Sequence, residues 1–303
     1  MQGKELPKEL EYKLLKRKRN KMPIANTSNE YKKQSFEKLY KLYNIKDKAD
    51  YDGSIIKYEC TINGERGLFK ERRSTRSKDH IMEQVVYELS KVIGVSCCFS
   101  SCRKAQGVYG SFSRFEVTDV SKVIAYADIL NRLEDNVVSI INNTMKLTRG
   151  NINTFVKQLY QYIIFDFIIG QQDRHLENLA VLRVDNRKIR WYPLYDNGFC
   201  LSACSSHDIA IEELNRGFYA SRMGDSSDIE QAILDFRHII FPDDLRNLIK
   251  YNKLNENIIL NIIDRADKYN QMPNNRRIAI TKFIIRQIKM IHNININNSL
   301  LEV

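Results

Sequence analysis

The first stretch with a clear hydrophobic–polar pattern predicts a β-hairpin. Two strand-like runs, "SIIKYECTI" and "ERGLFK", stand on either side of Asn63 and Gly64. An Asn-Gly pair between such runs is the strongest short signal for a two-residue type I′ turn. That turn places Lys57 opposite Lys70, so two basic side chains arrive at the same end of the hairpin.

Apolar residues then recur at helical spacing in two longer segments. The segment "KDHIMEQVVYELSKVIG", residues 78–94, carries an apolar stripe and predicts a helix with Gly94 as its C-cap. Residues 94–117 are typical of two or three short strands. Residues 151–169 predict a second helix, which ends at Gly170.

The runs "LAVLRV" and "IRWYPLYD" predict a second hairpin around the loop "DNRK". In that register residue 184 pairs with residue 189. Extended along both strands, the pairing brings Asn178 to within one residue of Asp196. We therefore expect Asp173, Asn178 and Asp196 to be neighbours in space.

Together these elements predict an α+β protein in two lobes. Residues 50–117 form a small β-rich N-lobe. Residues 118–303 form a larger, mostly helical C-lobe, with several amphipathic helices over 208–296. Residues 1–49 form a basic helical extension that is expected to pack on the N-lobe. A chain of 303 residues, 43% of them hydrophobic, is long enough to bury a core of this size.

The charge balance favours anionic partners. The formal net charge is +11 and the pI is about 9.2, which suits nucleotides, nucleic acid, phospholipid surfaces or acidic proteins. A solvated basic surface without a partner explains the same numbers and is the commoner case. Nucleic acid is therefore an open partner class but not the favoured one.

The sequence shows no leader-like or membrane-spanning segment. Its beginning is charged, and no run approaches the roughly 20 apolar residues of a membrane span. We expect a cytoplasmic protein, or an exported effector without a cleavable signal peptide. The spacing of the six cysteines does not match a zinc site, so buried reduced thiols are expected.

The polar residues around the second hairpin carry the candidate chemistry. Carboxylate and amide oxygens are ligands that Mg²⁺ prefers, so Asn178 and Asp196 are predicted metal ligands. Asp173 is then placed to orient or deprotonate a nucleophilic hydroxyl, as in protein-kinase-type phosphoryl transfer. Lys70, at the end of its strand, is placed for nucleotide phosphates, and Glu83 on the next helix can hold it by an ion pair.

Each of these residues also has an ordinary structural explanation. Loop aspartates cap helices, polar residues are common at strand ends, and a lysine that ends a strand is often a surface residue. Glu88 is an alternative partner for Lys70, although it falls on a different helix face. We expect Arg174 to pair with an acidic group, His175 to hydrogen-bond its loop, and Asp166 to brace a loop or lie on the helix surface.

The segment "FDFIIGQQDRHLENLAVL…WYPLYDNGFCL" resembles the catalytic core of the HipA-like kinases, small bacterial Ser/Thr kinases among them. It is similar, more distantly, to the phosphoinositide kinases, which share the "DRH…N" loop. The resemblance covers about residues 50–290 and implies a bilobal protein-kinase-like fold. It implies Asp173 as catalytic base, Asn178 and Asp196 as Mg²⁺ ligands, and Lys70 on the α- and β-phosphates of ATP.

The same resemblance implies the rest of a nucleotide site. The segment "DGSIIK" would be the phosphate loop, with three of its residues at the phosphates: Gly53, Ser54 and Lys57. The segment "YGSFSRF" would cross between the lobes, and its central residues would offer backbone groups to adenine: Ser111, Phe112 and Ser113.

Three functions follow from these patterns. The expected one is an ATP- and Mg²⁺-dependent kinase that phosphorylates Ser/Thr on an unidentified protein. An antitoxin-type or host partner is left open, as is autophosphorylation at Ser54, Ser74 or Thr75. The second keeps the reaction but uses a lipid or small-molecule acceptor. The third, motivated by the glycine-poor phosphate loop, is a catalytically weak nucleotide- or nucleic-acid-binding module.

Overall fold

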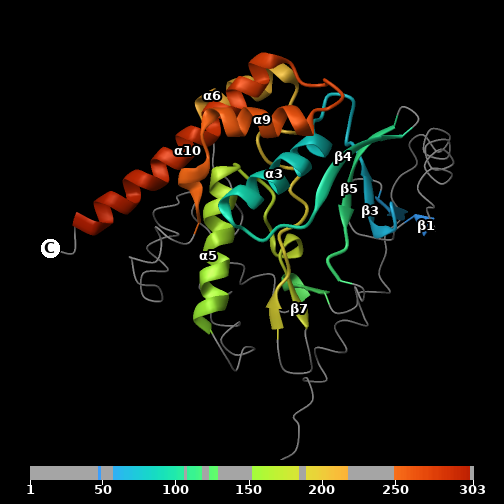
Figure 1. The fold of residues 1–303 in the computed structure, drawn as a ribbon, viewed down its shortest axis with the longest axis horizontal. Coiled ribbons are helices and arrows are strands. Elements are labelled where there is room, and N and C mark those ends of the chain that lie inside the picture. The colour runs from blue at the N-terminus through green and yellow to red at the C-terminus, as the bar shows by residue number, and fades with distance from the viewer. Residues whose placement is uncertain are drawn as a thin grey trace, which may run out of the picture.

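The structure, a computed structural model, describes seven parts of the chain (Figure 1). The predicted helical extension, apart from a two-residue strand, and the predicted phosphate-loop residues Gly53 and Ser54 lie outside the described residues. The described parts are residues 47–48, 57–105, 108–117, 123–128, 152–183, 189–217 and 249–300.

A five-stranded antiparallel sheet holds the predicted hairpin at its centre. Asn63 and Gly64 have φ values of 53° and 81°, as a type I′ turn requires, and Lys57 pairs with Lys70 as predicted. The strands follow the order β1 (Asp47–Lys48), β2 (Lys57–Ile62), β3 (Glu65–Glu71), β5 (Val108–Arg114) and β4 (Ser100–Ala105).

Helix α3 (Asp79–Ile93) packs on one face of this sheet. It confirms the predicted helix and begins one residue later, after Lys78. Gly94 ends it in the left-handed conformation with φ 80°, and its N–H donates to the Ser90 carbonyl. The opposite face of the sheet buries a small apolar cluster of Tyr58, Cys60, Ile62, Phe69 and Phe112. Because strand side chains alternate, Lys57 and Lys70 lie on the α3 face.

Helix α5 (Ile152–Ile168) and a small second sheet form the next layer. The sheet contains β6 (Val123–Ala125), β7 (Ala180–Arg183) and β8 (Ile189–Trp191). Strand β6 was not predicted, since three residues are too few to show a period. Arg183, rather than residue 184, pairs with Ile189, so the predicted hairpin register is wrong by one residue. The predicted loop "DNRK" contains no glycine that requires one turn type. The sequence therefore does not determine the exact length of this loop or the register of its strands.

Three amphipathic helices in the last third of the chain agree with the prediction. Asn255 caps α9 by accepting from the Ile258 N–H. Figure 1 shows α3 between α9 and the five-stranded sheet. In the described part of the chain, no helix is long and apolar enough to cross a membrane. The helices are α6 (His207–Arg216), α9 (Glu256–Ala266) and α10 (Asn274–Leu300).

The main hydrophobic core is continuous from α3 to the C-terminal helices. Val85 and Leu89 of α3 are buried in the same cluster as Trp191 of β8 and Ile262 of α9. The fold is therefore α+β with antiparallel sheets. A lobe boundary after residue 117 remains a prediction, and the core passes across it.

Replacing Gly110 by Ala should destabilise the sheet more than a comparable change at Gly64. A Cβ at Gly110 would stand 2.3 Å from the Lys70 carbonyl oxygen, which belongs to the paired strand. We expect the free energy of unfolding to fall by roughly 2 kcal/mol or more. The measurement is urea-induced unfolding followed by the fluorescence of the single tryptophan.

Gly64→Ala is the matched control. Its Cβ would meet nothing within 4 Å, but φ at this position is +81°. The left-handed conformation alone should cost about 1 kcal/mol. A larger loss at Gly64 than at Gly110 would contradict the packing argument.

Candidate active site

The candidate site begins where α5 ends. The helix stops at Ile168, and Gly170 takes a left-handed φ of 55°, which turns the chain out of the buried layer. The Gln171 N–H donates back to the Asp166 carbonyl at 2.9 Å. A 3-10 turn over Leu176–Asn178 then leads into β7, so the polar loop is held between two buried elements.

The backbone of Asp173 is held on both sides, while its carboxylate stays partly exposed. The Asp173 N–H donates to Gln171 Oε1 at 3.2 Å, and its carbonyl accepts from Asn178 Nδ2 at 2.8 Å. The side chain is 29% exposed, with His175 Nε2 3.8 Å from its Oδ1. A fixed backbone with an accessible carboxylate suits a group that must accept a proton from a bound molecule.

Asn178 is oriented by its own amide nitrogen. That nitrogen donates to the Asp173 carbonyl and lies 3.1 Å from His175 Nε2. His175 in turn accepts from the Glu177 N–H through Nδ1, which confirms the loop-bracing role predicted for it. With the NH₂ group engaged, the amide oxygen of Asn178 is the atom left to act as a ligand.

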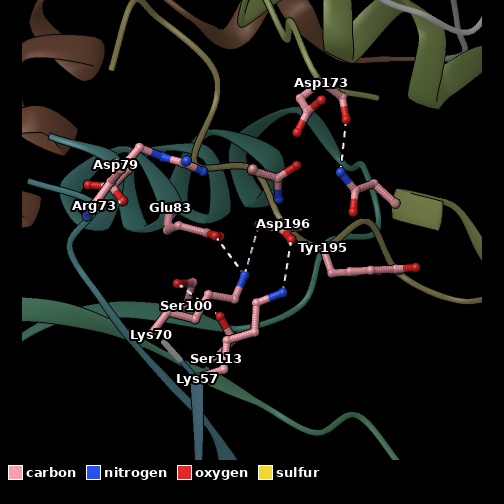
Figure 2. A network of polar contacts seen from close by, with 12 residues as sticks. Lys57, Lys70, Arg73, Asp79, Glu83, Ser100, Ser113, Asp173, Tyr195 and Asp196 are labelled. Carbon is pink, nitrogen blue, oxygen red and sulfur yellow. Dashed lines mark hydrogen bonds and ion pairs between the residues drawn. The ribbon is translucent and has the colours of Figure 1, made fainter. Parts of the chain in front are cut away.

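Asp196 lies between Asp173 and the two lysines of the first hairpin (Figure 2). Lys70 Nζ is 3.1 Å from Asp196 Oδ1, and Lys57 Nζ is 3.7 Å from Oδ2. Asp196 has a φ of 55°, a left-handed conformation that Asp tolerates better than most residues. Two cations therefore meet one carboxylate at the junction of the two sheets.

Lys70 forms a second ion pair with Glu83 of α3, at 3.0 Å from Oε1. Both side chains are buried. This confirms Glu83 as the helix partner of Lys70. Glu88, the alternative, instead lies 3.9 Å from both Lys91 and Arg265 near the surface.

The opposite charges around Lys70 and Asp196 determine their protonation states. Burial alone would lower the pKa of Lys70, but the carboxylates of Asp196 and Glu83 outweigh it and raise that pKa above its ordinary value. Burial alone would raise the pKa of Asp196, but Lys70 and Lys57 hold it well below its usual range. Both groups are therefore charged at neutral pH.

Arg174 joins the loop after α5 to the segment after β8. It is fully buried, and its Nε and Nη2 donate to the two carboxylate oxygens of Asp166 at 3.0 and 3.1 Å. Its Nη1 donates to the carbonyl of Asn178 at 3.0 Å and to that of Tyr195 at 2.7 Å. Its Nη2 also donates to Asn197 Oδ1. The predicted acidic partner is thus Asp166, which braces the loop and is not on the helix surface.

The structure brings together Lys57, Lys70, Glu83 and Asp196. Asp173 lies across from them in Figure 2, and Asn178 is hydrogen-bonded to its backbone. The structure does not bring the predicted adenine-binding backbone there. Strand β5 lies between β3 and β4, and Ser111 pairs with Lys70 on one side and Cys102 on the other.

The hinge assignment is therefore corrected. Backbone groups of a central strand are used by its neighbours, so those of Ser111 to Ser113 are not free for a base. The side chain of Phe112 is buried in the cluster on the far face of the sheet. The strand continues to Arg114, so most of the segment "YGSFSRF", which the resemblance assigned to the crossing between lobes, belongs to β5.

Sequence reasoning missed three residues that shape the site. Tyr195 donates from its hydroxyl to the Glu177 carbonyl at 2.6 Å, and Asn197 donates to Cys97 Sγ at 3.3 Å while accepting from Arg174. Gln171 holds the backbone of Asp173. The available signal was a run of polar side chains beside buried elements, which marks a network but does not identify its partners.

The donor set fits a magnesium ion that is bound together with phosphates. Within the described residues, no group of three or more His, Cys, Asp or Glu side chains could hold a metal by itself. Asn178 and Asp196 supply one amide and one carboxylate oxygen, and Mg²⁺ commonly takes one or two protein oxygens plus phosphate and water. The six cysteines are free thiols, four of them buried, as expected.

Solved structures show a kinase-like fold. No family model and no curated protein sequence matches the chain. The crystal structure of CtkA, a proinflammatory kinase of Helicobacter pylori, is similar with a TM-score of 0.64 and 15% identity, over 84% of this chain and 95% of that one.

Two weaker likenesses have TM-scores too low to carry an argument. HipA of Shewanella oneidensis MR-1, in a complex with HipB and operator DNA, has a TM-score of 0.46 and 12% identity, over 92% of this chain and 76% of that one. The golgi casein kinase has a TM-score of 0.39 and 14% identity, over 82% and 73%.

Breaking the Arg174–Asp166 pair should be strongly destabilising. Arg174→Met or Asp166→Asn leaves a buried charge unpaired, so each should cost roughly 3–5 kcal/mol of unfolding free energy. The double variant should cost less than the sum of the two, because the second change removes the stranded charge. Urea unfolding of all four proteins measures this coupling.

Asp264→Asn is the control for that cycle. Its partner Arg277 lies 2.7 Å away, but Asp264 is 55% exposed, so the loss should be below about 1 kcal/mol. Additive losses at Arg174 and Asp166 would contradict the interpretation that the two charges form one unit.

Acidification should destabilise the native protein less when Lys70 is absent. The folded pKa of Asp196 is depressed, so its stabilising effect is present above the unfolded pKa of about 3.9 and is lost as pH falls below it. In Lys70→Met that pKa moves back up, and the drop in unfolding free energy between about pH 7 and pH 3 shrinks. Lys282→Met, an exposed change on α10, should keep the native drop. An unchanged pH dependence in Lys70→Met would refute the assignment.

Proposed function

We propose that this protein is an ATP- and Mg²⁺-dependent kinase that transfers the γ-phosphate to Ser or Thr of a protein. The observation that carries the proposal is the double ion pair of Lys70 with Glu83 and Asp196. It links a strand lysine, a helix glutamate and a later loop aspartate, the set of residues used in protein-kinase-type phosphoryl transfer. The kinase-like fold supports it.

In this proposal the acceptor hydroxyl is handled by Asp173. Its backbone is fixed by Gln171 and Asn178, and its carboxylate is accessible, so it can orient the hydroxyl and accept its proton. Asp173 would act mainly by positioning the hydroxyl and not as a strong base, because catalysis of phosphoryl transfer depends mostly on positioning.

The nucleotide phosphates would be held by Mg²⁺ and by the lysines of the first hairpin. Asn178 and Asp196 would hold Mg²⁺, which supplies charge neutralisation for the phosphate oxygens. Lys70 and Lys57 now face the Asp196 carboxylate and would share the phosphates with it. We propose the same contact role for Gly53 and Ser54 of the phosphate loop.

The proposal includes two lobes with the nucleotide between them. We propose that adenine packs near the apolar cluster of Cys98, Ala180, Leu182 and Tyr192, which adjoins Tyr195 and hence Asp196. This replaces the earlier assignment to the β5 backbone. Autophosphorylation of the chain is part of the same proposal.

Phosphoryl transfer from labelled ATP tests the proposal. Asp173→Asn, Asp196→Asn and Lys70→Met should each lower the rate by at least roughly 100-fold, because each removes a group that acts on the reacting atoms. Asp208→Asn, an exposed carboxylate on α6, should retain the native rate. Equal labelling by the three site variants and native protein would refute the proposal.

The acceptor is tested in the same reaction. A mixture of total protein and lipid extract, separated after labelling, should carry label in protein bands. Label confined to the lipid fraction would favour the alternative lipid kinase, which the net charge of +11 also suits. Steeply salt-dependent nucleic-acid binding without ATP turnover would favour the binding module.

A further inference from the structure

A second group of cations gathers around two tyrosines outside the candidate site. Three basic side chains and the rings of Tyr109 and Tyr269 form what we call the Tyr109–Tyr269 surface. Lys104 and Lys268 are exposed, while Arg72 is partly exposed. The surface consists of Arg72, Lys104, Lys268, Tyr109 and Tyr269.

The fold builds this surface from three separate segments. Lys104 pairs with Tyr109 across β4 and β5, and the Arg72 N–H donates to the Tyr109 carbonyl from the end of β3. The loop between α9 and α10 adds Tyr269, whose hydroxyl accepts from the Lys104 N–H at 3.1 Å. Arg72 Nη1 lies 3.4 Å from Gln271 Oε1 of the same loop. Figure 1 shows this loop beside the segment that follows β3.

The cations are held by aromatic rings. Arg72 Cζ and Lys104 Nζ each lie 4.8 Å from the centroid of the Tyr109 ring. Lys268 Nζ lies 5.2 Å from that of Tyr269, and the two rings meet nearly edge to face at 5.7 Å. Cation–π contacts fix a cation without neutralising its charge.

Within the described residues, none of these three cations forms an ion pair with a carboxylate. Two nearby carboxylates, those of Asp267 and Asp79, are buried and already engaged. Asp267 accepts from Arg277 and from the Gln271 and Met272 N–H groups, and Asp79 accepts from Ser77 and the Arg73 N–H. The surface therefore keeps an uncompensated positive charge.

One cation of this surface, Arg72, also acts on Lys78. Burial and then the positive charges of Arg276 and Arg72 lower the pKa of Lys78, although Asp267 and Asp79 oppose this. Like charges held this close are unfavourable for the isolated protein, and an anion would relieve the repulsion.

We propose that the Tyr109–Tyr269 surface binds an acidic segment of a partner protein. Cations held on partly exposed rings suit carboxylates spaced along a flexible chain. Single-stranded nucleic acid would instead need open ring faces for base stacking. Since β3 and β4 flank β5 on opposite sides, Arg72 and Lys104 cover the two faces of Tyr109.

The surface adjoins the candidate site along one strand. Arg72 follows Lys70 by two residues on the same face of the sheet, a spacing of roughly 7 Å. If the proposed kinase activity holds, a bound acidic segment lies beside the phosphate-binding lysine and would hold a protein substrate there. The binding itself does not depend on that activity.

Fluorescence anisotropy with a labelled peptide of alternating Glu and Ser tests the proposal. Native protein should bind it with an affinity that weakens as salt is raised above about 0.05 M. The double variant Lys104→Glu/Lys268→Glu should weaken binding by roughly 10-fold or more. A matched peptide with Gln in place of Glu should bind no better to native protein than to the variant.

The control variant is Lys282→Glu/Lys289→Glu, which makes the same charge change at exposed positions on α10. It should change the affinity by less than about 2-fold, and unfolding curves should show that both double variants are folded. Asp173→Asn should bind the peptide like native protein, which separates this proposal from the catalytic one. Equal losses in both double variants, no binding by native protein, or tighter binding of an equally charged RNA would overturn the proposal.

Discussion

The buried contact between Arg174 and Asp166 is the constraint on which the candidate site depends. A guanidinium with five donors is enclosed here without solvent, and its acceptors come from three parts of the site: the Asp166 carboxylate on α5, the Asn178 carbonyl, and the Tyr195 carbonyl and Asn197 side-chain amide after β8. Such a group costs free energy to bury unless it is fully paired. The loop after α5 and the segment after β8 are therefore held at one separation.

That separation sets where Asp196 lies. The carbonyl of Tyr195 accepts from Arg174, so the next residue is presented toward the five-stranded sheet. There Lys70 bridges Asp196 to Glu83. Helix α3, the sheet and the segment that carries Asp196 are thus coupled through short polar contacts that a shift of any one element would disturb.

Much of this could be predicted from local patterns. The Asn63-Gly64 turn has one favoured geometry, so the register that places Lys57 opposite Lys70 followed from two residues. The apolar stripe of α3 likewise fixed which face carries Glu83. The "DRH" loop and the later Asp were recognisable because side chains with carboxylate and amide oxygens stood between buried elements.

The rest depended on contacts between distant segments. The length of strand β5 is decided by its neighbours β3 and β4, so the backbone of Ser111 to Ser113 could not be judged from its own sequence. Asn197 and Tyr195 gained roles only because Arg174 reaches them. The Tyr109–Tyr269 surface joins residues from three segments and leaves no local signature.

The most direct test of the account is the structure of the protein with a non-hydrolysable ATP analogue and Mn²⁺, located by its anomalous signal. The account predicts the metal between Asn178 Oδ1 and the Asp196 carboxylate, with Lys70 on the phosphates and still paired with Glu83. A nucleotide bound elsewhere, or a metal that contacts neither Asn178 nor Asp196, would contradict it.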